Sequence, residues 1–135
     1  MCPVDNFTRS DETSDSSESE TMFIITAPLN VNDLKTMAEK MFGTIVKAVV
    51  DVDRRIIAID AELHSDEEGL LLENGSRQEH LWGINLLPEF DKESVDFIEF
   101  DSMINLRPSQ GNKTRGVDDP DVQKVIISIV NEWIR

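Results

Sequence analysis

Two short runs rich in β-branched residues, joined by a brief polar turn, constrain this chain more than any other feature. The runs are Ile45–Val52 and Ile56–Leu63, and Asp53-Arg54-Arg55 stands between them. Val and Ile favour strands, and so short a polar connection returns the second strand beside the first. The sequence therefore predicts an antiparallel hairpin, around which the other elements have to be arranged.

Three segments have the signals of helices. Apolar residues recur at helical spacing in Val31–Phe42, where Asn30 or Asn32 is available as an N-terminal cap. Residues 119–133 begin with Asp-Pro-Asp, which supplies a cap, a proline at the first helical position and an acid in the first turn. Residues 65–73 begin with Ser-Asp-Glu-Glu, the form of a capping box, and predict a shorter helix.

Further strands are predicted at Met22–Ala27, at His80–Leu87 and in the first half of Phe97–Val117. Gly83 inside the second of these marks a bulge, a close approach of another group, or a packing accommodation. The resulting order is strand, helix, strand, strand, helix, strand, strand, helix. This order predicts an α+β fold: a mainly antiparallel sheet of about five strands with the helices packed on one face.

The charge distribution predicts one domain and a tail. The chain has 135 residues and a net charge of −14, and residues 1–21 are acidic, rich in Ser and Thr and poor in apolar side chains. We therefore expect residues 1–21 to be a disordered acidic tail and residues 22–135 to form a single α+β domain. The negative charge makes nucleic acid an unlikely partner. The lone Cys2 and the lack of a long apolar run predict a cytoplasmic protein that does not enter a membrane.

Acidic side chains on two predicted strands suggest a metal site. Period two places Asp60, Glu62 and His64 on one face of their strand, and Glu99 and Asp101 on the polar face of another. If these strands are neighbours, Glu62, His64, Glu99 and Asp101 could hold a divalent cation such as Mg²⁺, Mn²⁺ or Ca²⁺. The alternative is an ordinary polar outer face of a half-exposed sheet, with the acids after His64 serving as a helix cap.

A basic polar loop stands out in this acidic chain. After Pro108 it combines glycines with hydrogen-bonding side chains, which is typical of an ordered loop. Arg107, Ser109, Lys113 and Arg115 are candidate ligands for a phosphate or carboxylate. The alternative is that the arginines pair with neighbouring acids. The spacing lacks the signature of a nucleotide-binding phosphate loop.

Several motifs resemble those of a family of small uncharacterised bacterial proteins. The longest, at residues 99–120, reads Glu-Phe-Asp-Ser-Met-Ile-Asn-Leu-Arg-Pro-Ser-Gln-Gly-Asn-Lys-Thr-Arg-Gly-Val-Asp-Asp-Pro. Shorter ones lie at residues 48–52, 62–68 and 81–85, and the resemblance covers roughly residues 22–135. The family is a domain of unknown function, so the resemblance implies no activity and assigns no catalytic residue.

Two functional hypotheses follow. The first is a small cytosolic binding or regulatory module that recognises an anionic small molecule or a protein partner. The alternative is a divalent-metal-dependent hydrolase acting on a phosphate ester. In that enzyme Arg107 or Arg115 would bind the phosphate, and the cation would be held by Glu62, His64, Glu99 and Asp101. The sequence leaves open whether the protein is an enzyme.

Overall fold

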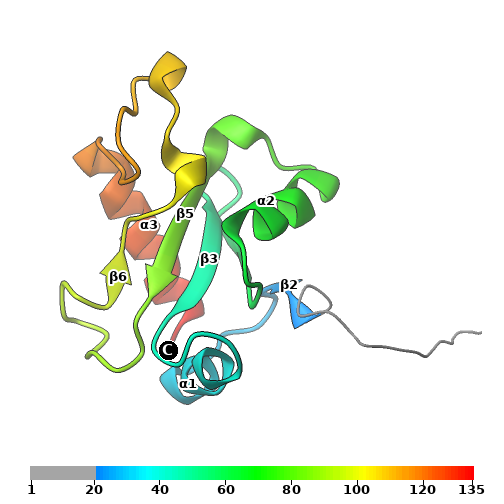
Figure 1. Cartoon of the computed structure of the whole chain (residues 1–135), viewed down its shortest axis with the longest axis vertical. Coiled ribbons are helices and arrows are strands. Elements are labelled where there is room, and N and C mark those ends of the chain that lie inside the picture. The colour runs from blue at the N-terminus through cyan, green and yellow to red at the C-terminus, as the bar shows by residue number, and fades with distance from the viewer. Residues whose placement is uncertain (1–20) are drawn as a thin grey trace, which may run out of the picture.

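The computed structural model describes residues 21–135, which form a five-stranded antiparallel sheet and three α-helices (Figure 1). The predicted α+β class and the predicted order of strands and helices are confirmed. Apart from Thr21, the expected acidic tail lies outside the described residues. The strands are β2 (Phe23–Ile24), β3 (Val46–Asp51), β4 (Ile56–Ile59), β5 (Leu81–Leu86) and β6 (Ile98–Glu99), in the order β2-β4-β3-β5-β6. The helices are α1 (Val31–Lys40), α2 (His64–Glu73) and α3 (Pro120–Trp133).

The predicted hairpin is present as β3 and β4, and it is held by a buried carboxylate. Asp51 pairs with Ile56 at the turn and is fully buried. One of its carboxylate oxygens accepts hydrogen bonds from the amides of Asp53 and Arg54, at 2.9 and 3.0 Å, and the other accepts from the hydroxyl of Ser76 at 2.6 Å. These bonds satisfy the buried charge and fix the turn.

Helices α1 and α3 cover one face of the sheet and bury its main core. Both begin as their sequences predict, since Asn30 forms a capping box with Asp33 and Asp119 caps α3. Alternate residues of the central strands point to this side, as period two requires. The buried residues that meet there include Leu34, Ala38, Ala48, Val50, Ile57, Ile59, Ile84, Leu86, Ile126, Ile129 and Val130.

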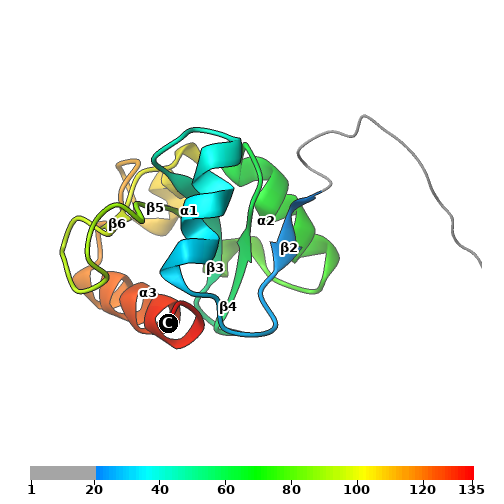
Figure 2. The same ribbon diagram turned by 90° about the horizontal axis from the view of Figure 1, so that it is seen from below.

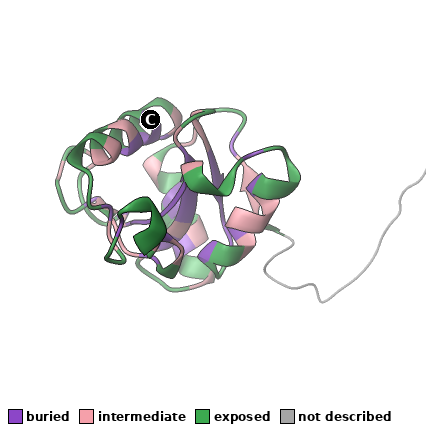
Figure 3. Cartoon of the chain, turned by 90° about the horizontal axis from the view of Figure 1, so that it is seen from above, coloured by how far each residue is buried: buried purple, intermediate pink, exposed green. Residues whose placement is uncertain are grey.

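Helix α2 lies on the opposite face, which corrects the expectation that all the helices share one side. Figure 2 shows α2 and α3 on opposite sides of the strands. Leu71 of α2 packs there with Val49, Ala58 and Leu81 in a second, smaller core cluster. The strands are therefore apolar on both faces at this point, and the purple buried segments of Figure 3 lie between helices on either side.

The start of α2 also differs from its prediction. The helix begins at His64, and Leu63 occupies the N-cap without a side-chain hydrogen bond, so the capping box predicted from Ser65 does not form. Glu67 instead turns inward, where its Oε2 accepts a hydrogen bond from the amide of Ala61 at 3.1 Å. Burial raises the pKa of Glu67 well above its usual value.

Two predicted strands end early. Strand β4 stops at Ile59 and Asp60 has a φ of 74°, so Asp60, Glu62 and His64 do not line one strand face. Strand β6 contains only Ile98–Glu99, and 3-10 turns at Met103–Asn105 and Pro108–Gln110 replace the alternation expected beyond it. Within the described residues, no helix is long and apolar enough to span a membrane.

Candidate functional site

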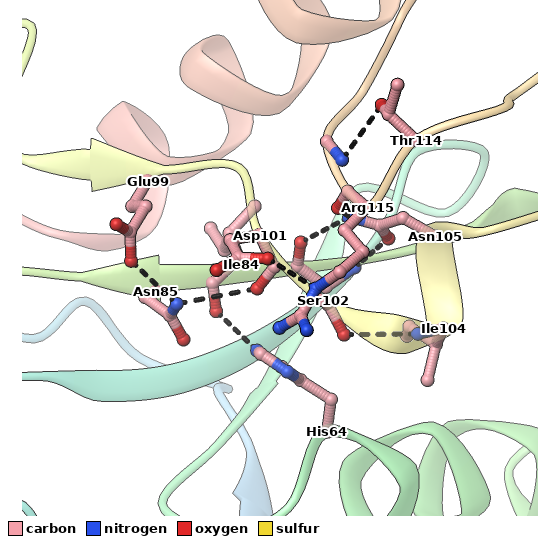
Figure 4. Close-up of polar contacts among 12 residues, drawn as sticks. His64, Ile84, Asn85, Glu99, Asp101, Ser102, Ile104, Asn105, Thr114 and Arg115 are labelled. Carbon is pink, nitrogen blue, oxygen red and sulfur yellow. Dashed lines mark hydrogen bonds and ion pairs between the residues drawn. The ribbon is translucent and has the colours of Figure 1, made fainter.

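A pocket of about 400 Å³ lies on the α2 side of the sheet, where β3, β5 and β6 meet the start of α2. Its wall combines side chains from segments that are far apart in the sequence (Figure 4). The charged and polar residues around it include Lys47, His64, Asn85, Glu99, Asp101 and Arg115.

His64 is held in one orientation and one protonation state. Its Nε2 lies 2.7 Å from the carbonyl oxygen of Ile84. Because a carbonyl can only accept, this bond places the proton on Nε2 and leaves Nδ1 with a lone pair. Burial, the largest cause, lowers the pKa of His64 from 6.5 to about 4, so the ring is neutral at pH 7. No hydrogen bond joins Nδ1 to another described residue, and the ring therefore offers the pocket an acceptor.

Asn85 lies at the floor of the pocket with one polar atom unsatisfied. The residue is 4% exposed. Its Nδ2 donates to Oε1 of Glu99 at 2.9 Å and to the carbonyl oxygen of Asp101 at 3.4 Å. Its Oδ1 is buried and has no hydrogen-bond partner among the described residues. An unpaired buried amide oxygen costs free energy unless a donor reaches it, so this atom points to a group that the protein itself does not supply.

Arg115 extends into the pocket from the basic polar loop after Pro108, and an acidic side chain orients it. Its Nε donates to Oδ1 of Asp101 at 2.8 Å. The two side chains are 55% and 44% exposed, respectively, so solvent screens the pair. The Nη1 and Nη2 groups of Arg115 form no hydrogen bond with another described residue. Figure 4 shows the guanidinium directed toward the ring of His64, so its outer edge faces the pocket wall at the start of α2.

The loop that carries Arg115 is ordered by two buried asparagines. Asn105 accepts from the amide of Gly83 at 2.8 Å and donates to the carbonyls of Gly83 and Arg115 at 3.0 and 2.9 Å. Its side chain thus takes the place of a strand beside β5, beyond the point where β6 ends. Asn112 donates to the carbonyls of Asn105 and Gly116, both at 2.8 Å. The predicted ordered polar loop is therefore built around amide side chains.

Gly83 allows the loop and α2 to approach the strand closely. A Cβ at this position would lie 2.5 Å from both Cβ and Oγ of Ser102 and 3.2 Å from Cδ2 of His64. The first two distances are too short for any side chain to be accommodated without movement of Ser102. Of the interpretations open for Gly83, the structure shows close approach of other groups.

The basic residues predicted for an anion site are divided. Arg115 lines the pocket, but Arg107, Ser109 and Lys113 do not. The guanidinium of Arg107 stacks on Trp82, 4.2 Å from the ring centre, and donates to the carbonyl of Gln78 at 2.6 Å. Its burial lowers its pKa. Arg107 thus joins the loop to the core, while Ser109 and Lys113 are exposed on the loop.

The residues proposed for a metal site are also divided. His64, Glu99 and Asp101 line the pocket, whereas Glu62 is exposed outside it. In residues 21–135 no group of three or more His, Cys, Asp or Glu side chains is placed to hold a metal ion. The Nε2 atom of His64 is already bonded to a carbonyl. The hydrolase hypothesis therefore has no geometric support in the part of the chain that is described.

Sequence reasoning missed several members of the pocket. Lys47 and Asn85 are isolated polar residues within apolar strands, and they are paired across β3 and β5. The available signal was a polar residue at a position where the alternation of the strand predicts a buried, apolar side chain. Ser102 gave the same signal, because it interrupts the apolar face of the predicted strand, but its place in the pocket depends on where β6 ends.

Comparison with known proteins places the chain in a family without assigning a function. A family model described as "Protein of unknown function (DUF5674)" matches residues 23–133. No curated protein and no solved structure matched the chain. The match spans the whole sheet and its helices, including the loop that carries Arg115, and so agrees with the resemblance to uncharacterised proteins found in the sequence motifs. The chain belongs to this family of proteins of unknown function (DUF5674).

Proposed function

We propose that this protein is a binding module whose pocket beside α2 takes a small molecule with an anionic group. The proposal is carried by the hydrogen bonding of Arg115 in the pocket. Its Nε donates to Asp101, whereas Nη1 and Nη2, at the outer edge of the guanidinium, form no hydrogen bond with another described residue. A guanidinium oriented in this way can donate two parallel hydrogen bonds to a carboxylate or phosphate.

Two further features of the pocket favour a ligand that carries negative charge. Lys47 adds a second cation, in a protein whose net charge is −14. The start of α2 adds backbone amides, because His64 and Ser65 line the pocket and the N-cap provides no side-chain acceptor for them. The first amides of a helix favour negative charge.

The shape of the site favours a small molecule over a protein surface. A volume of about 400 Å³ is within the range of small-molecule pockets, roughly 300–1,000 Å³. The neutral ring of His64 and the amide of Asn85 would fix the orientation of a ligand by hydrogen bonds. These features support binding, and nothing in the geometry calls for a chemical step.

The proposal is tested by comparing two arginine variants. Arg115→Ala and Arg77→Ala each remove one cation, and each of these arginines is exposed and paired with one acid, Asp101 or Glu79. We expect phosphate, sulfate and small carboxylates to raise the melting temperature of wild type and of Arg77→Ala, with a smaller rise for Arg115→Ala. Equal protection of all three proteins would contradict the proposal, as would no protection of any.

The same variants measure what Arg115 contributes to stability. Because its pair with Asp101 is half exposed, we expect Arg115→Ala to change the free energy of unfolding by less than about 1 kcal/mol. Urea unfolding provides the measurement. A loss of about 3 kcal/mol would mean that the arginine is a structural partner of the acid rather than a ligand group.

A further inference from the structure

One end of the pocket consists of atoms that can only accept hydrogen bonds. Asn85 Oδ1 is buried without a partner, and the carboxylate of Glu99 lies beside the same side chain, 2.9 Å from Nδ2. The carboxylate of Asp101 and the unprotonated Nδ1 of His64 add acceptors toward the middle of the pocket. In Figure 4, Asn85 and Glu99 lie together at one side of the site, apart from Arg115.

The protein has a cation near this end but does not use it there. Lys47 stands opposite Asn85 in the pairing of β3 with β5. Its Nζ lies over the ring of Phe42 instead, 5.4 Å from the ring centre. The buried oxygen of Asn85 therefore lacks a donor although a lysine is its neighbour in the sheet.

The other end of the pocket has the opposite character. The outer edge of Arg115 and the first amides of α2 are donors, and both favour negative charge. A ligand that satisfies both ends needs a cationic donor on one side and an anionic acceptor on the other.

We infer that the ligand is a small zwitterion, with an ammonium group at Asn85 and Glu99 and an anionic group at Arg115. This inference rests on the proposed function, because it assumes that the pocket binds a small anionic molecule. An α-amino acid is the simplest compound of this class, and an amino-alkyl phosphate is the phosphate equivalent. The ammonium would face the charge of Glu99, and a small rotation of the Asn85 side chain would bring its unpaired oxygen, which neighbouring atoms cover, within reach of a hydrogen bond.

Matched sets of three compounds test the inference on the full-length protein. Each set contains an L-amino acid, the carboxylic acid that lacks its amino group, and the amine that lacks its carboxylate, as in alanine, propionate and ethylamine. Phosphoethanolamine, ethyl phosphate and ethanolamine form the equivalent phosphate set. Titration calorimetry should show at least one zwitterion binding about tenfold or more tightly than both of its partners.

A charge-neutral variant locates the ammonium end. Glu99→Gln keeps an oxygen for Nδ2 of Asn85 but removes the charge. We expect it to weaken zwitterion binding about tenfold, while the compound without the amino group binds at least as tightly as to wild type. Glu73→Gln, at the exposed end of α2, makes the same charge change away from the pocket and should bind like wild type.

The outcomes separate the inference from the proposed function. If the acids without an amino group bind as tightly as the amino acids, the zwitterion inference is wrong while an anion-binding pocket remains. If the amines bind as tightly as the zwitterions, or if no compound binds at millimolar concentration, both the inference and the anion-binding proposal are rejected. An equal loss in Glu99→Gln and Glu73→Gln would also remove the assigned ammonium position.

Discussion

Replacing Asn105 by alanine should destabilise the protein strongly, because this side chain substitutes for a missing strand. It makes hydrogen bonds of 2.8, 3.0 and 2.9 Å to the amide of Gly83, the carbonyl of Gly83 and the carbonyl of Arg115. The carbonyl of Arg115 keeps a second donor, the amide of Ser102 at 2.9 Å. The variant therefore leaves two backbone groups of the buried Gly83 without partners.

The size of the effect follows from those two groups. An unsatisfied buried donor or acceptor costs about 1–3 kcal/mol, and the lost side chain of a fully buried residue also leaves a cavity. We expect the free energy of unfolding to fall by about 3–5 kcal/mol. Asn105→Asp keeps the acceptor for the amide of Gly83 but sets a carboxylate against two carbonyl oxygens, so it should be no more stable than the alanine variant at neutral pH.

Urea unfolding followed by tryptophan fluorescence measures these differences, with Trp82 and Trp133 as probes. Asn131→Ala on the exposed face of α3 is the control and should remain within about 0.5 kcal/mol of wild type. A loss of less than about 1 kcal/mol for Asn105→Ala would show that β6 or solvent satisfies Gly83 without the side chain, and would refute this account of the loop.

Three further predictions concern the neighbourhood of the pocket. Gly83→Ala should lower the free energy of unfolding by about 2–3 kcal/mol, because its Cβ would lie 2.5 Å from Ser102, and Ser102→Gly in the same chain should recover part of the loss. An unchanged urea midpoint for Gly83→Ala would contradict the close approach. His64 should titrate near pH 4 by NMR, and stability should fall as pH drops from 6.5 toward 4, because the unfolded ring takes up a proton near its ordinary pKa of 6.5. A measured pKa near 6.5 would mean that the ring is not buried. The raised pKa of Glu67 has the opposite effect: above its ordinary pKa of 4.5 the unfolded state loses a proton that the folded state keeps, so stability falls by about 1.4 kcal/mol per pH unit until the folded pKa is reached. Glu67→Gln should remove this slope, and the same dependence of unfolding free energy on pH in both proteins, measured in urea, would refute the prediction.

The parts of the fold that follow from local pattern were predictable. The hairpin of β3 and β4, the capping box at Asn30 and the start of α3 at Asp119 each depend on residues close together in the sequence. Turn length, capping residues and periodicity determine such features. The same reasoning identified the segment after Pro108 as an ordered polar loop, although it extended the preceding strand too far.

The errors arose where distant residues decide the local structure. Ser65 and Glu68 have the form of a capping box, yet the burial of Glu67 against the amide of Ala61 sets the start of α2. The alternation after Glu99 resembles a strand, but Asn105 turns inward because Gly83 needs its hydrogen bonds. Neither tertiary contact can be read from the periodicity of its own segment.

The candidate site was predicted in part for the same reason. His64, Glu99, Asp101 and Arg115 were chosen as chemically capable residues, and they line one pocket. Only the hydrolase hypothesis joined them, and otherwise they were assigned to a metal site and an anion site. The sequence does not show that the basic polar loop folds back over the start of α2. The pairing of Arg115 with Asp101 brings those two sets together.

The most direct test of a ligand pocket beside α2 is NMR mapping of a bound compound. The tightest zwitterion or anion from the binding series would be titrated into ¹⁵N-labelled protein. The account predicts that the largest shifts occur at the amides of His64 and Ser65, at the side-chain amide of Asn85 and at Nε of Arg115. Shifts centred instead on the groove between α3 and β6, lined by Ile98 and Ile127, would contradict it.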